Sequence, residues 1–256
     1  MMGERLRLEW TAKTHPGKVR EHNEDALFGS DQVGVWAVAD GMGGHERGEW
    51  ASAVVVEALG TVTDGMDFDR QVDQAAKAIH RANGVIFSEA REKSINMGTT
   101  VVACVMRDNR FAVVWAGDSR AYVLRDGVLH QLSRDHTRVQ ELIDRGYLTV
   151  EQSVGHPMGH MLSRAVGVGE ALELDAVADS VTAGDVFLLC SDGLYGEVSE
   201  TEITDILTHT PFENAAGALV DACLSYEAKD NVTVIVIRAS EATRLQLAPQ
   251  NWGSPQ

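Results

Sequence analysis

Cysteine is scarce in this sequence, and long apolar runs are missing. Cys104, Cys190 and Cys223 are the only cysteines among 256 residues. An odd number without regular spacing argues against a disulfide framework, so we expect small buried thiols in a reducing compartment. No apolar run approaches the ~18 residues that a membrane span requires. The first residues also lack the charged-then-apolar pattern of a signal peptide. These absences predict a cytoplasmic chain without a membrane segment.

Basic residues are also few relative to acidic ones. The chain has 22 Lys and Arg against 38 Asp and Glu, which gives a formal net charge of −16. Such a chain is repelled by nucleic acids and by anionic membranes, and it tolerates bound cations. We expect most of these acids to solubilise the surface, and we expect neither a nucleic-acid partner nor a membrane partner.

The pattern of apolar residues predicts an α+β fold without repeats or low-complexity tracts. Helical spacing of apolar residues occurs at 46–59 and 68–90, and again at 139–145, 200–207 and 214–226. Strand-like runs occur at 6–14, 33–39, 99–106, 111–115, 121–125, 128–132, 186–190 and 232–237, with further strand character at 177–181. Few βαβ alternations are present, which argues against a doubly wound parallel sheet. We therefore expect two stacked, mainly antiparallel sheets flanked by helix pairs, a four-layer αββα sandwich.

We expect one domain over residues 1–238, followed by a C-terminal tail at 239–256. Residues 133–166 contain a short helix and a loop rich in Gly, His and Met, which indicates a surface excursion from the core. The tail lacks clear periodicity, so we expect it to be loosely held.

Four aspartates lie at the ends of apolar runs. Asp40, Asp118 and Asp192 follow such runs, and Asp230 precedes one. In antiparallel sheets one strand begins beside its neighbour's end, so these acids could converge on one rim. Clustered carboxylates repel each other, and a divalent cation such as Mg²⁺ or Mn²⁺ removes that cost. The glycine after Asp40 would let the carbonyl of Gly41 serve as a ligand. A single Asp-Gly pair is usually a turn, but four such acids favour a metal site.

A charged segment near the N-terminus offers a phosphate contact. Arg20 is followed by Glu24 and Asp25. The planar guanidinium of Arg20 can bind two phosphate oxygens at once, while the acids hold metal-bound water. Taken alone, this segment would be interpreted as a solvated charged turn.

Six short motifs then occur in a fixed order and together resemble one protein family. They are Arg20-x-x-Asn23-Glu24-Asp25, Ala39-Asp40-Gly41-Met42-Gly43-Gly44, Met97-Gly98-Thr99-Thr100, Gly117-Asp118-Ser119-Arg120, Ser191-Asp192-Gly193 and Lys229-Asp230-Asn231. Each motif is weak by itself, but six in register are highly specific. Over residues 8–238 the chain resembles the metal-dependent protein phosphatases, the PPM or type 2C class, in their bacterial form.

The resemblance implies a role for each matching residue. It implies that Asp40 bridges two metal ions, that Asp192 and Asp230 complete the first site, and that the Gly41 carbonyl binds the second. It implies that Glu24 acts on the second ion through water, with Asp25 and Asn231 behind the ligands. Asp118 then matches the acid that shares a third ion with Asp192, and Arg20 matches the phosphate-binding arginine. Residues 133–166 match the flap that borders the active site and influences substrate choice.

The resemblance also implies an activity and partners. The expected reaction is hydrolysis of phosphoserine and phosphothreonine in proteins by a water activated between two Mn²⁺ or Mg²⁺ ions. The expected catalytic residues are Arg20, Asp40, Asp192 and Asp230. The expected substrates are phosphoproteins made by a separate Ser/Thr kinase, and we expect the phosphatase to act as a monomer in signal transduction.

One position departs from some members of the family. Met42 stands where they have a histidine proposed to protonate the leaving alkoxide, and methionine cannot donate that proton. His45, three residues later, or a metal-bound water are the remaining candidates for the general acid.

Other interpretations of the sequence are weaker. Cys104 and Arg110 have the Cys-x5-Arg spacing of cysteine-dependent phosphatases, but no glycine lies between them and the segment is predicted to be a β-hairpin. His156 and His160 are spaced like a zinc pair, but Gly155, Pro157 and Gly159 argue against a helix there. Two functional alternatives stay open: a catalytically silent phosphoprotein binder and a phosphoesterase for small molecules.

Overall fold

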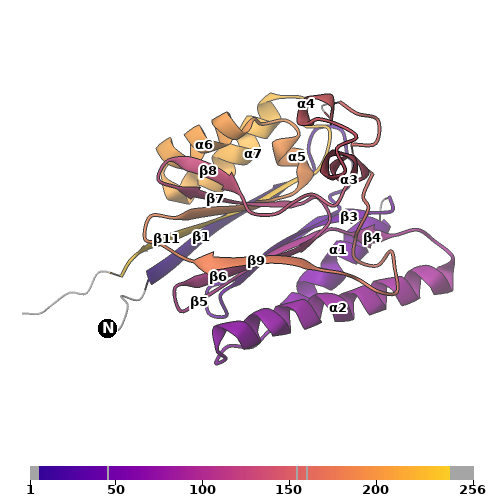
Figure 1. Ribbon diagram of the computed structural model, residues 1–256, viewed down its shortest axis with the longest axis horizontal. Coiled ribbons are helices and arrows are strands. Elements are labelled where there is room, and N and C mark those ends of the chain that lie inside the picture. Colours follow the sequence, from indigo (N-terminus) through magenta and orange to yellow (C-terminus); the bar gives the residue numbers. More distant parts are fainter. Residues whose placement is uncertain (1–5, 45, 154, 160, 243–256) are drawn as a thin grey trace, which may run out of the picture.

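The computed structural model describes residues 6–44, 46–153, 155–159 and 161–242. Its strands form two antiparallel sheets stacked face to face, with helices on both outer faces (Figure 1). The predicted α+β sandwich is therefore confirmed. Among the described residues, no helix is long and apolar enough to cross a membrane.

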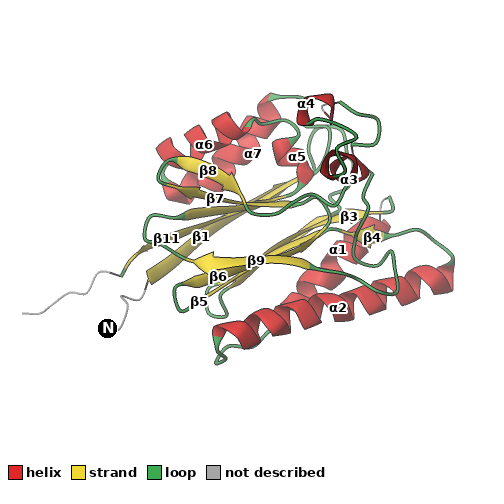
Figure 2. Cartoon of the chain, viewed as in Figure 1, coloured by secondary structure: helices red, strands yellow, loops and turns green. Residues whose placement is uncertain are grey.

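The first sheet has five strands in the order β1-β11-β10-β7-β8. Helices α6 and α7 pack on its outer face with the short helix α5 (Figure 2). The bounds of these elements are β1 Leu6–His15, β7 Arg120–Arg125, β8 Val128–Gln131, β10 Val186–Cys190, β11 Val232–Glu241, α5 Asp192–Tyr195, α6 Glu200–His209 and α7 Ala215–Ser225, with a 3-10 turn at Phe212–Asn214.

The second sheet follows the order β2-β3-β5-β6-β9, with the short strand β4 paired to β3. The long helices α1 and α2 cover its outer face (Figure 1). The bounds are β2 Asp25–Ser30, β3 Val35–Met42, β4 Gly98–Thr99, β5 Val101–Arg107, β6 Arg110–Ala116, β9 Asp175–Ser180, α1 Glu46–Leu59 and α2 Phe68–Lys93.

Alternate residues of a central strand pack into different layers of the core. In β3, Val35, Ala37 and Ala39 face α1 and α2, whereas Trp36 and Val38 lie between the two sheets. Side chains alternate across a strand, and here both faces are covered, so the strand is an unbroken apolar run. The polar residues at strand ends are thereby left at the rim, where the chemistry is concentrated.

Two hairpins have the turns that their sequences predict. Asp108 and Asn109 have φ of 52° and 56°, and Asp126 and Gly127 have φ of 52° and 77°. Two consecutive positive φ values match the twist of antiparallel strands, and Asp, Asn and Gly tolerate them best. These turns join β5 to β6 and β7 to β8, and Asp118 lies in the connection between β6 and β7.

Several element bounds differ from the prediction. Strand β2 was not predicted, because Asp25–Ser30 has few apolar residues and pairs only along one edge, with β3. Strand β3 continues to Met42, so Asp40 lies within the strand and not at its end. The four-residue helix α5 starts at Asp192 and is too short to show a helical period. Strand β11 continues to Glu241, so the predicted domain boundary at 238 falls within a strand. The tail from 243 lies outside the described residues.

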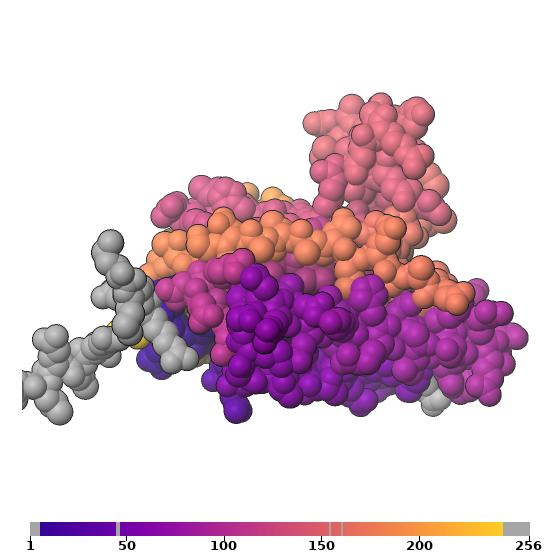
Figure 3. Space-filling model, turned by 60° about the horizontal axis from the view of Figure 1, so that its bottom comes forward, coloured from indigo at the N-terminus to yellow at the C-terminus, as the bar shows by residue number. Residues whose placement is uncertain are grey.

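The segment 133–166 leaves the sandwich and returns to it. It contains α3 (Arg138–Asp144) and α4 (Val150–Ser153). Figure 3 shows this segment as a knob that rises above the body of the molecule. Its first part is tied to Gly117 through a backbone hydrogen bond from His136, and its last residue, Val166, bridges to Thr99. Both ends of the segment are therefore fixed close to the predicted site.

Candidate functional site

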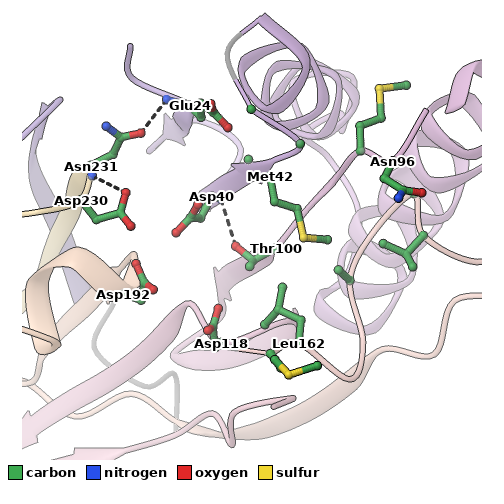
Figure 4. A pocket seen from close by; sticks show the side chains of 18 of the residues that line it. Glu24, Asp40, Met42, Asn96, Thr100, Asp118, Leu162, Asp192, Asp230 and Asn231 are labelled. Atoms are coloured by element: carbon green, nitrogen blue, oxygen red, sulfur yellow. Dashed lines mark hydrogen bonds between the residues drawn. The ribbon is translucent and has the colours of Figure 1, made fainter. Parts of the chain in front are cut away.

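A cavity of about 1380 Å³ gathers most of the residues that the sequence singled out. Figure 4 shows Asp40, Asp118, Asp192 and Asp230 on one side of it, all directed inward. The predicted residues that line this cavity are Arg20, Glu24, Asp40, Gly41, Asp118, Asp192, Asp230 and Asn231. Asp25 lies directly opposite Asp40 in the pairing of β2 with β3. His45 lies outside the described residues.

The four aspartates come from both sheets and from the connection between them. Asp40 belongs to β3 in the second sheet, and Asp118 lies in the turn that leads from β6 of the second sheet to β7 of the first. Asp192 and Asp230 follow β10 and precede β11 in the first sheet, where Cys190 pairs with Val234. The end of β10 thus lies beside the start of β11. The site occupies the rim where the two stacked sheets meet.

The backbone of Asp40 is held by two threonines. Its N–H donates to Thr100 Oγ1 at 3.0 Å, and its carbonyl accepts from Thr100 N at 2.8 Å and from Thr99 Oγ1 at 2.9 Å. Thr100 Oγ1 also lies 2.6 Å from Ser119 Oγ, beside Asp118. These contacts couple Asp40 to Asp118. The sequence showed the threonines as part of a motif but gave no sign of this contact, because about 60 residues separate them from Asp40.

Asn231 connects the N-terminal segment to the loop before β11. Its side-chain amide donates to Pro16 O at 3.0 Å and to His22 O at 2.9 Å, and its Oδ1 accepts from Glu24 N at 2.8 Å. Arg20 Nη2 donates to Asp230 Oδ2 at 2.8 Å. Neighbouring acids, chiefly Asp230, raise the pKa of Arg20 further above its ordinary value. A permanent positive charge therefore stands at the edge of the acid cluster.

Two glycines allow backbones to approach closely at the site. A Cβ at Gly41 would collide with the carbonyl oxygens of Gly48 and Glu24, and one at Gly193 would collide with the carbonyl of Asn231. Only glycine fits at either position without a shift of the backbone. Gly41 consequently lies against the start of α1, and Gly193 lies against the loop that carries Asp230.

Burial and mutual repulsion make the acid cluster costly to ionise. Burial, followed by repulsion from Asp25 and then Asp192, raises the pKa of Asp40 well above its ordinary range. Burial is also the first cause that raises the pKa of Asp25 to about 7, although Thr233 and Ser191 hydrogen bonds oppose it. The pKa of Asp118 rises to about 7, again by burial and then by Asp192. Charged carboxylates so placed require a compensating cation.

The donor set fits small, hard divalent ions. Oxygen ligands from Asp40, Asp118, Asp192 and Asp230 and a close-lying carbonyl at Gly41 are of the kind that Mg²⁺ and Mn²⁺ bind. Asp25 Oδ1 is buried and accepts no hydrogen bond from the described residues. Within the described residues, however, no three acidic, histidine or cysteine side chains are grouped tightly enough to hold an ion by themselves. Backbone carbonyls and water would have to complete the coordination, as is usual for Mg²⁺.

A half-buried ion pair that the sequence did not reveal connects the site to the outlying segment. Arg120 donates to both carboxylate oxygens of Asp135, at 2.7 to 3.2 Å, and its guanidinium lies 3.7 Å from the centre of the Tyr195 ring. Tyr195 OH donates to Asp118 O at 3.0 Å. Arg120 therefore joins the start of the outlying segment to Asp118 and to the helix that begins with Asp192. Its place in the Gly117-Asp118-Ser119-Arg120 motif was visible, but its partner was not.

The rival cysteine site is not formed. Cys104 is fully buried in β5, and burial raises the pKa of its thiol far above its ordinary value. Arg110 lies across the hairpin, over the Phe68 ring at 4.0 Å, and pairs with Asp69 at 3.2 Å. A reactive cysteine needs an accessible thiolate. Of the two histidines considered for zinc, His160 lies outside the described residues.

Comparisons with known proteins agree with this geometry. The family model described as protein phosphatase 2C matches residues 17–233. The serine/threonine protein phosphatase PstP of Mycobacterium tuberculosis is 38% identical over 236 residues, which are 90% of this chain. The chain spans only 45% of that relative's length. The serine/threonine phosphatase stp of Listeria monocytogenes is 35% identical over 235 residues, which are 88% of this chain and 93% of the relative.

A solved structure shows the same fold with metal bound. The catalytic domain of PstP in complex with two manganese ions has a TM-score of 0.82 and 36% identity, covering 92% of this chain and 100% of that one. The family model spans most of the chain, and the relatives match nearly all of it. This chain is a member of the protein phosphatase 2C family.

Proposed function

We propose that this chain hydrolyses phosphoserine and phosphothreonine in proteins, as a metal-dependent protein phosphatase. The observation that carries the proposal is the single cavity that holds Arg20 together with Asp40, Asp118, Asp192 and Asp230. Acids alone would repel a phosphate, and an arginine alone would only bind one. Together with divalent cations, they provide what phosphate monoester hydrolysis requires.

Each side chain has a proposed part. Asp40, Asp192 and Asp230 would hold the first ion, while the Gly41 carbonyl and Glu24, through water, would hold the second. Asp118 and Asp192 would hold a third, and Asp25 and Asn231 would support the ligands from behind. When bound, Mn²⁺ or Mg²⁺ supplies Lewis acidity and an activated water.

Arg20 would bind the phosphate oxygens and balance the charge that develops on them. Its side chain is exposed, and its partner Asp230 Oδ2 lies at 2.8 Å. The guanidinium can therefore turn toward a phosphate without losing contact with the acid cluster. For the general acid, His45 or a water molecule are the proposed donors, because Met42 lines the cavity and carries no proton.

The physiological setting is part of the same proposal. The relatives are named serine/threonine phosphatases, which supports substrates made by a separate Ser/Thr kinase. We place the catalytic domain within the region that ends with β11 at Glu241, and we propose that it acts as a cytoplasmic monomer.

A comparison of substrates tests the proposal against its two alternatives. The catalytic efficiency, kcat/KM, would be measured with Mn²⁺ for a phosphothreonine peptide, free phosphothreonine and a sugar phosphate. We expect the peptide to be preferred by about tenfold or more, because the cavity contacts residues beside the phosphate. Preference for a small phosphoester would instead support a small-molecule phosphoesterase. Binding of the peptide without hydrolysis of any substrate would identify a silent phosphoprotein binder.

A further inference from the structure

The cavity extends well beyond the acid cluster, into a region that the proposed chemistry does not use. Its lining there comes from the C-terminal end of α2, the residues that follow it, and the end of the segment 133–166 with the loop after it. We call this region the apolar arm and define it by Met42, Phe87, Ile95, Met97, Leu162 and Val168. In the view of Figure 4, Met42 and Leu162 lie between the aspartates and Asn96.

Met42 and Val168 form the floor of the arm. A Cβ built on Gly98 would lie 2.8 Å from Met42 Cε and 3.0 Å from Val168 Cγ2, so both side chains close over that glycine. Val168 is 60% exposed, and the neighbouring Met161 is 52% exposed. Large apolar side chains that stay exposed inside a cavity next to a charged site are typical of a binding surface.

The wall that carries Val168 is held in place by buried hydrogen bonds. Asn83 of α2 is 3% exposed; its amide donates to Gly169 O at 3.0 Å and to Glu170 O at 3.2 Å, and its Oδ1 accepts from Gly167 N at 2.7 Å. Thr99 and Val166 exchange two backbone hydrogen bonds of 3.0 and 2.8 Å. The arm is therefore formed before any ligand arrives, which lowers the entropy cost of binding.

Charge around the arm favours an uncharged occupant over a basic one. The residues that line it from α2 and from 161–168 include no acid, but they include Arg91 and Arg164. Arg164 is paired with Asp175 at 2.6 Å, and Arg91 lies 5.7 Å from the centre of the Phe87 ring. A lysine or arginine side chain would meet two guanidinium groups there, and the carboxylates nearest to Arg164, those of Asp175 and Glu173, are already paired with it. An apolar side chain has no charge to desolvate, and it buries apolar surface against methionine, leucine and valine side chains.

We propose that the apolar arm binds an apolar side chain of the phosphorylated polypeptide, close in sequence to the phosphoresidue. The inference rests on the proposed function, because it takes the acid cluster as the place where the phosphate lies. The continuity of the arm with that cluster, within one cavity, identifies the occupant as a residue of the same peptide. The arm thus selects phosphorylation sites by an apolar neighbour.

The test uses phosphothreonine peptides that differ only by Leu or Gln at one flanking position, with each position varied in turn. Two readouts are compared: kcat/KM with Mn²⁺, and binding of fluorescein-labelled peptides by anisotropy. We expect kcat/KM to be about fivefold higher for the Leu peptide than for the Gln peptide at one position. This preference is smaller than the discrimination of a fully enclosed pocket, because the arm is partly open. In Val168→Asn the ratio of kcat/KM for the Leu peptide to kcat/KM for the Gln peptide should fall to nearly one. The matched control is Val150→Asn, because Val150 is 65% exposed and does not line the cavity.

Each outcome decides the inference. No preference at any position, or a preference that Val168→Asn and Leu162→Asn both retain, overturns the proposed subsite. Hydrolysis of p-nitrophenyl phosphate, measured in parallel, reports on the acid cluster alone. Hydrolysis without peptide preference means that the proposed function stands and the subsite is wrong. Leu-dependent binding without any hydrolysis means that the subsite stands and the proposed function is wrong.

Discussion

At the scale of single residues, Arg20 is the cation best placed to meet a phosphate. It lies exposed at the edge of the cavity and donates to Asp230 Oδ2. A planar guanidinium can bind two phosphate oxygens, which an ammonium group cannot do in the same way.

Arg20→Ala should lower kcat/KM for a phosphothreonine peptide by about 10²-fold, the range found when one donor to a transition-state anion is removed. Arg20→Lys should keep a kcat/KM between those of the wild type and Arg20→Ala, because lysine retains the positive charge but cannot bind two phosphate oxygens with a planar group. Steady-state kinetics of the three proteins would check this. Equal rates for all three would show that Arg20 does not touch the phosphate.

Asp118 provides a second prediction, about stability. Burial and the charge of Asp192 raise its pKa from 3.8 to about 7. The folded protein therefore binds a proton that the unfolded chain has released, and the stability of metal-free protein falls as pH rises from about 4 to about 7.

Asp118→Asn should then raise the melting temperature of the protein in EDTA at pH 8 by about 2–4 °C, the effect of ~1 kcal/mol in a chain of this size. The difference should shrink at pH 5, where the folded wild type is protonated at Asp118. Scanning calorimetry at both pH values would measure it. A lower melting temperature for the variant at pH 8 would mean that the ionised carboxylate of Asp118 does not destabilise the metal-free protein.

The acids of the site could be predicted from the sequence, but their supports could not. An aspartate next to glycine at the end of an apolar run is visible in one dimension. The contact between Thr100 and Asp40 joins residues 60 apart, and the pairing of Arg120 with Asp135 joins a motif to a surface loop. Such contacts depend on the packing of strands, which local patterns do not encode.

At the scale of elements, helix α2 supports the arm as well as the core. Its buried face packs on the second sheet, and Asn83 reaches from it to the loop that carries Val168. Asn83→Ala should lower the free energy of unfolding by about 1–3 kcal/mol, because the loop's buried N–H and carbonyl groups lose their partner. Urea unfolding would measure this. Lys77→Ala, on the exposed side of α2, is the control and should change stability by less than about 0.5 kcal/mol.

The start of the segment 133–166 is predicted to be sensitive to acid. Gly117 N–H donates to His136 Nδ1 at 3.1 Å, so the ring carries its proton on Nε2, which faces Asp175 Oδ2 at 3.2 Å. Burial, reinforced by the charge of Arg164, lowers the pKa of His136 below 6.5 in spite of Asp175. The unfolded chain takes up this proton first as pH falls, so the contribution of His136 to stability is complete above about pH 6.5 and is lost below it.

His136→Asn keeps an acceptor near Nδ1 but does not titrate. Between pH 7 and pH 5 the wild type should therefore lose more stability than the variant. Urea unfolding at several pH values would check this. Parallel losses in both proteins would show that His136 does not couple the segment to pH.

Elements with a clear apolar pattern could be predicted, and two elements without one could not. Helix α1 was predicted with the bounds that it has, and α2 was predicted only three residues short. Both show a clear helical period. Strand β2 was missed because Asp25–Ser30 has few apolar residues, and α5 was missed because four residues are too few to show a helical period. Because β2 brings Asp25 beside Asp40 and α5 begins at Asp192, the missed elements are the ones that complete the site.

At the scale of the whole molecule, the site exists only when the two sheets are stacked. Asp40 comes from one sheet, Asp192 and Asp230 flank strands of the other, and Asp118 lies in the turn that connects the two sheets. Ions held by all four would join the sheets at their rim. The position of the four acids at the ends of apolar runs allowed this convergence to be predicted, although spacing alone could not show which sheet carries which acid.

The most direct test of the central claim is hydrolysis of p-nitrophenyl phosphate by the wild type and by Asp192→Asn, with Mn²⁺ and with EDTA. We predict turnover by the wild type with Mn²⁺ and no turnover with EDTA. We also predict a rate at least about 10³-fold lower for Asp192→Asn, because a ligand proposed to hold the first and the third ion is changed. Circular dichroism of each protein would establish that it is folded. A folded wild type that is inactive with Mn²⁺ and with Mg²⁺, or a variant as active as the wild type, would contradict the account.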